Sequence, residues 1–230
     1  MATFVLVHGA WHGAWCWRRV ERVLAARGHE VFSPTLTGVG ERSHLLNADI
    51  DLDTHILDVV NLIKWQELTD VVLVGHSYGG LVISGVAEQV GPAIAAFVML
   101  DAFHLDHGQS IADVSGIADT IRAAQRDGAT TLPPRAAASF KVNENDRAWV
   151  DAQCTPQPIK CFTQKQTLTG AREHIANKVY IRAADYPNAM FDQGLATARA
   201  KGWRTYEVPC GHDVMIDKPE RLAEILEEVA

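Results

Sequence analysis

The stretch GHSYG at residues 75–79 fits the pattern Gly-x-Ser-x-Gly. The β-branched run VVLV at residues 71–74 precedes it, and a helix-forming stretch follows it. This order is typical of a nucleophile elbow, in which a sharp turn lifts the serine hydroxyl above a sheet and tolerates only small residues two positions away. The pattern predicts Ser77 as a nucleophile at a helix N-terminus, where developing negative charge is stabilised.

A serine hydroxyl is a weak nucleophile and needs a neighbouring base. In a strand-and-helix fold with this elbow, the base lies on a loop that follows the last strand. His212 stands at such a place, after Gly211 and before the last predicted helix. The chain has 10 histidines, and position selects His212 among them.

The third catalytic member is an acid that holds the imidazole in the correct tautomer. It should follow a strand and lie between Ser77 and His212 in the chain. Asp185, after the run KVYIRAA, is expected on these grounds. Asp101, after the run FVML, remains an alternative, although it could instead cap the segment that follows it.

The stretch HGAWHGAW at residues 8–15 repeats four residues directly. An acyl-transfer site needs backbone N–H donors for the oxyanion, one from the residue after the nucleophile and one from an early strand-to-helix loop. We therefore expect the N–H groups of Tyr78 and Ala10 to form the oxyanion hole. Gly9 would let the backbone approach the substrate, and Trp11 would line the mouth of the pocket.

The two histidines of this stretch are four residues apart, a spacing that is also found in zinc-binding helices. However, His8 ends a predicted strand and a glycine follows it at once, and no HExxH glutamate is present. We predict no metal site and no organic cofactor.

Bulk composition narrows the function classes. The chain has 230 residues, of which 47% are hydrophobic, enough for one domain with a substantial core. The net charge of −7 argues against a nucleic-acid partner, and no basic run favours a membrane surface. No signal peptide is recognised at the N-terminus, and the four cysteines form no CxxC pair. We expect reduced thiols and a cytoplasmic location.

Six apolar runs alternate with helical patterns, which predicts an α/β fold with a parallel sheet covered on both faces. The runs lie at residues 3–9, 29–34, 70–77, 93–103, 177–185 and 203–209. The stretch from about 103 to 176 breaks the rhythm and is polar. We expect residues 1–230 to form a single domain in which this stretch is an inserted cap.

These motifs together resemble the α/β-hydrolase superfamily, and more narrowly the group of plant methylesterases, plant hydroxynitrile lyases and their bacterial esterase relatives. The resemblance extends over nearly the whole chain and is weakest in the insertion. It implies a six-stranded mostly parallel sheet with Ser77 as nucleophile, His212 as base and Asp185 as acid. It also implies Ala10 and Tyr78 as oxyanion donors.

Two positions differ from the lyases of that group, which carry a threonine in place of Gly9 and a lysine in place of Asp213. An aspartate beside the catalytic histidine would oppose a departing cyanide ion. We therefore predict a serine esterase that acts on small carboxylic esters, with a homodimer possible. The alternatives are a lactonase or thioesterase with the same triad, a hydroxynitrile lyase, and a ligand-binding protein of this fold without turnover.

Overall fold

The central sheet has six strands in the spatial order β2–β1–β3–β4–β7–β8, and all neighbouring strands are parallel. A computed structural model describes residues 1–230. The strand bounds are β1 Thr3–Val7, β2 Glu30–Phe32, β3 Val71–His76, β4 Ile94–Leu100, β7 Asn177–Ala183 and β8 Arg204–Val208. The predicted α/β fold with a six-stranded parallel sheet is confirmed.

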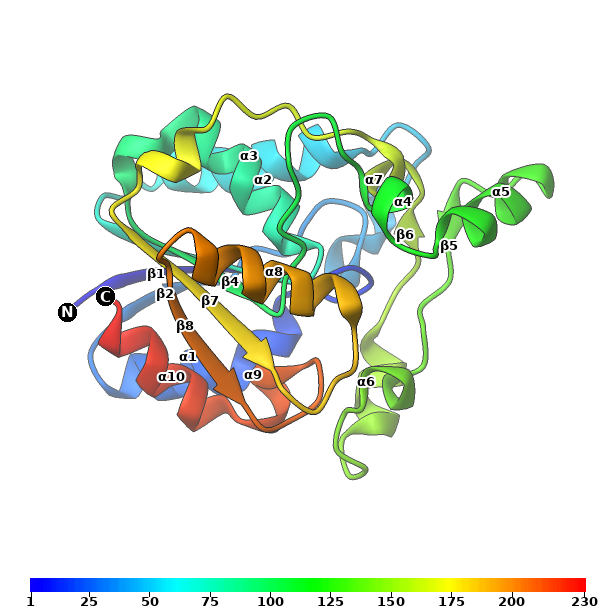
Figure 1. The fold of residues 1–230 in the computed structure, drawn as a ribbon. Helices are drawn as coiled ribbons and strands as arrows, with labels where there is room; N and C mark the ends of the chain where they lie inside the picture. The colour runs from blue at the N-terminus through cyan, green and yellow to red at the C-terminus, as the bar shows by residue number, and fades with distance from the viewer.

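Helices cover both faces of the sheet (Figure 1). One face is covered by α1 Arg18–Ala26, α9 Val214–Asp217 and α10 Pro219–Glu228, and the other by α2 Leu52–Trp65, α3 Gly79–Val90 and α8 Ala189–Ala200. The central strand β3 is buried at every residue, since both of its faces are packed against helices.

Local sequence sets where several of these helices begin and end. Asp51 caps α2 by accepting a hydrogen bond from the N–H of Thr54 at 2.9 Å, while the Thr54 hydroxyl accepts from the N–H of Asp51. Gly28, with a φ of 86°, follows the end of α1, where the chain must turn left-handed. Pro219 stands in the first turn of α10.

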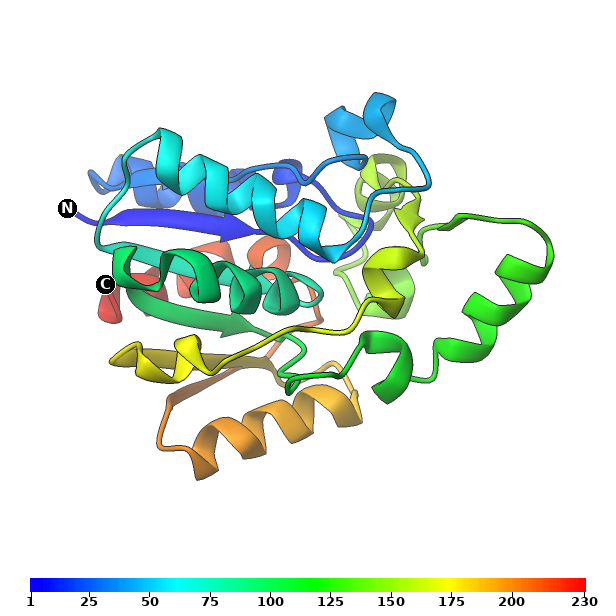
Figure 2. The same ribbon diagram turned by 90° about the horizontal axis from the view of Figure 1, so that it is seen from above.

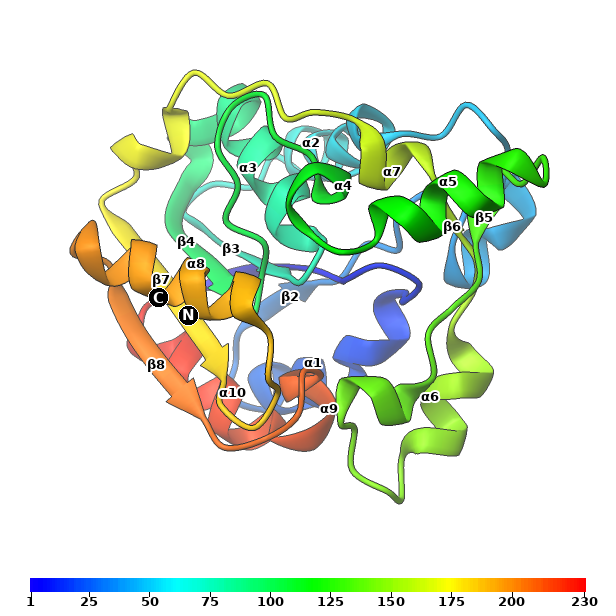
Figure 3. The ribbon, with the colours of Figure 1, turned by 45° about the vertical axis from the view of Figure 1, so that its right-hand side comes forward.

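Most of the segment between β4 and β7, here called the insertion (residues 103–176), lies beyond the carboxyl ends of the strands, and its last part runs back along the domain to the start of β7 (Figure 2). Its regular elements are α4 Ile111–Val114, α5 Ala118–Arg126, β5 Thr131–Leu132, α6 Arg147–Gln153, β6 Gln157–Pro158 and α7 Lys160–Thr163. β5 and β6 pair antiparallel in a two-stranded sheet of their own. Figure 3 shows α5 at the outer edge of the insertion, away from the main sheet.

Short 3-10 helices complete the chain, at Ala14–Trp17, Gly40–Leu45, Gly91–Ala93, Ala137–Phe140 and Ala171–His174. The four cysteines form no disulfide. None of the helices combines the length and the apolar character that crossing a bilayer requires.

Candidate active site

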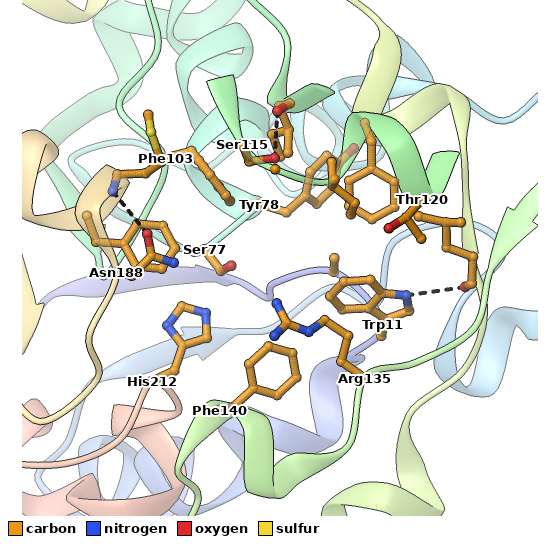
Figure 4. Close-up of a pocket in the computed structure, with 18 of the residues that line it drawn as sticks. Trp11, Ser77, Tyr78, Phe103, Ser115, Thr120, Arg135, Phe140, Asn188 and His212 are labelled. Atoms are coloured by element: carbon orange, nitrogen blue, oxygen red, sulfur yellow. Dashed lines mark hydrogen bonds between the residues drawn. The ribbon is translucent and has the colours of Figure 1, made fainter. Parts of the chain in front are cut away.

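A pocket of about 750 Å³ opens between the carboxyl ends of the strands and the insertion. Ser77, His212, Tyr78, Ala10 and Trp11 all line it, so five predicted site residues from three separate loops face one cavity. Figure 4 shows the Ser77 hydroxyl and the His212 ring on the same side of this pocket. The two side chains are not hydrogen-bonded in the unliganded protein, where catalytic contacts are commonly loose.

Ser77 occupies a sharp turn between β3 and α3. Its φ is 53°, a left-handed conformation that is strained for a residue with a side chain. A Cβ atom on Gly75 would lie 2.5 Å from the carbonyl oxygen of Gly79, and one on Gly79 would lie 2.7 Å from that of Val7. Both glycines of the motif are therefore required by close backbone contacts.

Backbone strain is concentrated around this pocket. Six residues other than glycine have a positive φ, and three of them lie at the site: Trp11 (66°), Ser77 (53°) and Asp101 (41°). Strained conformations persist where the surrounding structure holds them, and they are common at functional sites. The sequence predicted this geometry only for Ser77.

The acid that contacts His212 is Asp101 and not Asp185, so the expectation for Asp185 is wrong in this structure. Nδ1 of His212 donates a hydrogen bond to Oδ2 of Asp101 at 2.6 Å, and both residues are buried. Asp185 is exposed, and its backbone N–H donates to the carbonyl oxygen of Cys210 at 3.1 Å.

Strand register explains the choice of acid. His76 at the end of β3 pairs with Leu100 at the end of β4, so Ser77 and Asp101 are the first residues beyond two adjacent strands. Asp185 follows β7 by two residues, and the turn there exposes its side chain. The sequence signal for Asp101 was its place directly after β4, the strand that pairs with the strand leading into Ser77.

Arg182 and the backbone of β7 hold the second oxygen of Asp101. Nη1 of Arg182 donates to Oδ1 at 2.7 Å, and the N–H of Ala183 donates to the same oxygen at 3.1 Å. Oδ2 is left for His212. This arrangement fixes the tautomer of His212, because Nδ1 must carry a proton and Nε2 is left as a base.

Two backbone donors at the pocket are free. Neither the N–H of Ala10 nor that of Tyr78 donates a hydrogen bond within the protein. A Cβ atom on Gly9 would lie 3.0 Å from Cβ of Ser77 and 2.9 Å from Nδ1 of His76, so only glycine lets this loop come so close to the nucleophile. The pair of N–H groups is available to an oxyanion.

The insertion holds both loops of the site. The N–H of Trp11 donates to Oε1 of Gln157 at 3.0 Å, and the N–H of Thr155 donates to the carbonyl oxygen of Trp11 at 2.9 Å. On the other side, the N–H of His212 donates to the carbonyl oxygen of Phe140 at 2.9 Å. Trp11 itself is buried with its ring in the pocket lining, as predicted for the pocket mouth.

His12, from the second half of the repeat, forms a buried pair with Asp213. Nε2 of His12 lies 3.2 Å from Oδ2 of Asp213, and Nδ1 lies 2.8 Å from the carbonyl oxygen of Ala10. Both partners are acceptors, so both ring nitrogens must carry protons and His12 is a cation. The pair joins the oxyanion loop to the loop of His212.

The pKa shifts agree with this protonation state. Burial lowers the pKa of His12, but the charge and hydrogen bond of Asp213 outweigh burial and raise this pKa above its ordinary value. Burial raises the pKa of Asp213, but the charge and the hydrogen bond of His12 lead the effects that lower it to about 2. This function of His12 was not predicted, because its partner lies 201 residues away in the chain.

His8 and His76, which are also buried near the site, are neutral. His8 accepts a hydrogen bond from the N–H of Leu36 at Nε2, and Nδ1 faces the carbonyl oxygen of Gly9. Burial lowers the pKa of His8 to about 3. Burial, followed by the nearby His212, lowers the pKa of His76 well below its ordinary value.

Ligand atoms of His76, His212 and Asp213 lie within 4.8 Å of one another. Nε2 of His76 faces the carbonyl oxygen of His212 at 3.1 Å, and Nδ1 of His212 faces Asp101. At these two nitrogens a cation would have to displace protons and break contacts that orient His212.

The fold and the site geometry agree with a family model that matches residues 4–225, the alpha/beta hydrolase family. The chain belongs to this family. It is 42% identical to a protein named carbendazim hydrolyzing esterase from Nocardioides sp. (strain SG-4G), and the match covers 98% of each chain.

Other relatives match more narrowly in sequence or in fold. The chain is 39% identical to methylesterase 1 of Arabidopsis thaliana over 45% of its own length and 40% of that protein. Among solved structures, an extracellular alpha/beta-hydrolase from a Paenibacillus species superposes with a TM-score of 0.87 at 25% identity, covering 100% of this chain and 99% of that one.

Proposed function

We propose that the protein is a serine esterase that cleaves small carboxylic esters through an acyl-enzyme intermediate, with Ser77, His212 and Asp101 as its triad. The observation that carries this proposal is the hydrogen bond of 2.6 Å from Nδ1 of His212 to Asp101. It leaves Nε2 of His212 as a base in the same pocket as the strained Ser77. The full-length similarity to an esterase supports it.

In this mechanism Nε2 of His212 takes the proton of Ser77 as its hydroxyl attacks the ester carbonyl. The free N–H groups of Ala10 and Tyr78 stabilise the oxyanion that forms. His212 then gives its proton to the departing alcohol, and the Ser77 ester remains. Water, deprotonated by the same histidine, attacks this ester and releases the acid.

The same proposal gives the insertion a function. Phe140, Leu132 and Ile117 of this segment line the same pocket as Ser77 and His212. We propose a single hydrolase domain in which residues of about 103–176 act as the cap that shapes the substrate site. A lactonase or thioesterase would use the same triad, so substrate assays must separate these activities.

A hydroxynitrile lyase is disfavoured by the surroundings of Asp213. The position holds a carboxylate where the lyases carry a lysine, and this carboxylate is fully buried and paired with His12. It supplies no cation to stabilise a departing cyanide ion.

The test is hydrolysis of methyl, ethyl and aryl esters together with carbendazim, with wild type beside Ser77→Ala. We expect kcat to fall by about 10⁴-fold in the variant, since removing the nucleophile of a triad has effects of this order. Ser115→Ala changes another pocket serine, whose hydroxyl donates to the carbonyl oxygen of Ile111, and should leave kcat nearly unchanged.

Lactones and thioesters are assayed in parallel under the same conditions. Turnover that is confined to one of these classes would replace the ester assignment while keeping the triad. Equal activity in wild type and Ser77→Ala would overturn the serine mechanism itself.

A further inference from the structure

The pocket contains one side chain with a permanent charge, that of Arg135. No Asp or Glu is among the 23 residues that line the pocket, and 14 of the 23 are hydrophobic. The protein as a whole carries a net charge of −7, so a positive group in its principal cavity runs against the overall charge. In a largely apolar cleft the field of a single cation is focused toward the ligand.

The guanidinium of Arg135 has no hydrogen-bonding or ion-pair partner in the protein. The group lies over the ring of Phe140, with Cζ 5.4 Å from the ring centroid, and it forms no hydrogen bond or ion pair with the protein. Arg172 and Arg182, in contrast, have buried side chains that are held by several acceptors. The donors of Arg135 are therefore free to bind a ligand.

The backbone and the neighbouring rings direct this group into the pocket that Ser77 and His212 line. Figure 4 shows the guanidinium directed into the pocket beside Phe140, with His212 on one side and Trp11 on the other. Two prolines, Pro133 and Pro134, come directly before Arg135 and restrict the backbone after β5. The side chain therefore enters the pocket from a stiff segment of the insertion.

Hydrolysis of a neutral ester does not require this cation. The developing oxyanion is served by the N–H groups of Ala10 and Tyr78, and the leaving alcohol is protonated by His212. A guanidinium instead matches a carboxylate, which it can bind through two parallel hydrogen bonds.

We propose that Arg135 is a specificity-determining residue that makes the pocket select esters carrying a carboxylate in addition to the scissile ester bond. The substrate class is then a half-ester of a dicarboxylic acid, or another small ester with an anionic group. This inference rests on the proposed esterase activity and narrows its substrate class.

The test compares monomethyl and dimethyl esters of the same dicarboxylic acid, from succinic to adipic acid. For the best-fitting half-ester, Arg135→Met should raise KM about tenfold with little change in kcat, since a hydrogen bond to a charged group is lost at a partly solvated site. The KM of the diester should change by less than about twofold, because a neutral ester does not use the charge.

Two further variants serve as controls. Arg135→Lys keeps the charge but cannot form two parallel hydrogen bonds with a carboxylate. It should therefore keep part of the preference for the half-ester that Arg135→Met loses. Arg126→Met removes one positive charge from the exposed end of α5, outside the pocket lining, and should leave both KM values unchanged. Equal effects of Arg135→Met on diester and half-ester, or none on either, would overturn the inference.

Binding separates this inference from the esterase proposal. Calorimetry measures the affinity of the half-ester for Ser77→Ala and for Ser77→Ala combined with Arg135→Met. A loss of affinity of about tenfold in the double variant supports the anion site whether or not wild type turns the ester over. Equal affinity overturns it, even if Ser77-dependent hydrolysis of neutral esters is found.

Discussion

The two walls of the pocket differ in how their polar groups are used. On the sheet side, His212 and Asp101 are buried and hydrogen-bonded, and the Ala10 and Tyr78 N–H groups left free face the pocket. On the insertion side, the exposed residues Arg135 and Thr120 line the pocket, and their side chains form no hydrogen bond within the protein. The side chains of the sheet wall are held by hydrogen bonds within the protein, whereas these side chains of the insertion wall are free to bind a ligand.

The largest effect on the sheet wall should come from the acid. Asp101→Asn should lower kcat by about 10³- to 10⁴-fold, since the ring of His212 then loses the partner that fixes its tautomer. Asp185→Asn is the matched control, and its exposed side chain predicts a change of less than about twofold. Steady-state kinetics with one ester measures both. The reverse ranking would restore Asp185 as the acid.

Next in size is the buried pair beneath the site. Asp213→Asn leaves the buried cation of His12 without its counter-charge, and we expect the free energy of unfolding to fall by about 3 kcal/mol. Asp192→Asn, at an exposed carboxylate that pairs with Arg182, should cost less than about 1 kcal/mol. Urea unfolding at pH 5.5 measures both. Equal losses would remove the distinction between the buried and the exposed pair.

A single methyl group should distinguish the two walls. Gly9→Ala places a Cβ atom 3.0 Å from that of Ser77, so we expect kcat to fall by about ten- to a hundredfold through displacement of the nucleophile or the oxyanion loop. Gly116→Ala makes the same change on the insertion wall, where nothing lies within 4 Å of the added Cβ atom. We expect only a small change in KM there. Loss of kcat in Gly116→Ala would show that the insertion wall is as tightly fitted as the sheet wall.

The smallest predicted effect is a pH dependence of stability. Because the pKa of His12 is raised in the folded protein, its ionisation stabilises the fold. This stabilisation is complete below the ordinary histidine pKa of 6.5 and is lost as pH rises through the pKa of His12 in the folded protein. The lowered pKa of Asp213 also stabilises the folded protein. This stabilisation is present above the ordinary aspartate pKa of 3.8 and is lost as pH falls toward about 2.

The difference in unfolding free energy between wild type and Asp213→Asn should therefore be largest between pH 4 and 6.5 and smaller on either side. Urea unfolding from pH 3 to 8 measures this difference. A constant difference over the whole range would contradict the ionised pair.

Sequence predicted the parts of the molecule that depend on local patterns. Apolar runs identified the six strands, and the motif around Ser77 identified the elbow, because strand, turn and glycine spacing are all adjacent in the chain. His212 followed from the order of elements alone. The family model and the sheet topology confirm the fold.

Contacts between distant residues were not predicted. The choice between Asp101 and Asp185 depends on the register of adjacent strands and on the turn after β7, which no local pattern encodes. The pairing of His12 with Asp213 and the entry of Arg135 into the pocket arise only when separate loops meet. In the insertion, short elements and irregular spacing left no periodic signal to follow.

The hydrogen bonds that join the insertion to the loops of Trp11 and His212 have a consequence for protein engineering. Phe140 accepts from the N–H of His212, while Gln157 and Thr155 hold Trp11 next to the oxyanion donors. A chimaera that exchanges the insertion for that of a relative therefore also replaces the residues that hold these two loops in position. Grafts that preserve these three hydrogen bonds should transfer substrate preference, whereas grafts that remove them should yield folded enzymes with a lowered kcat.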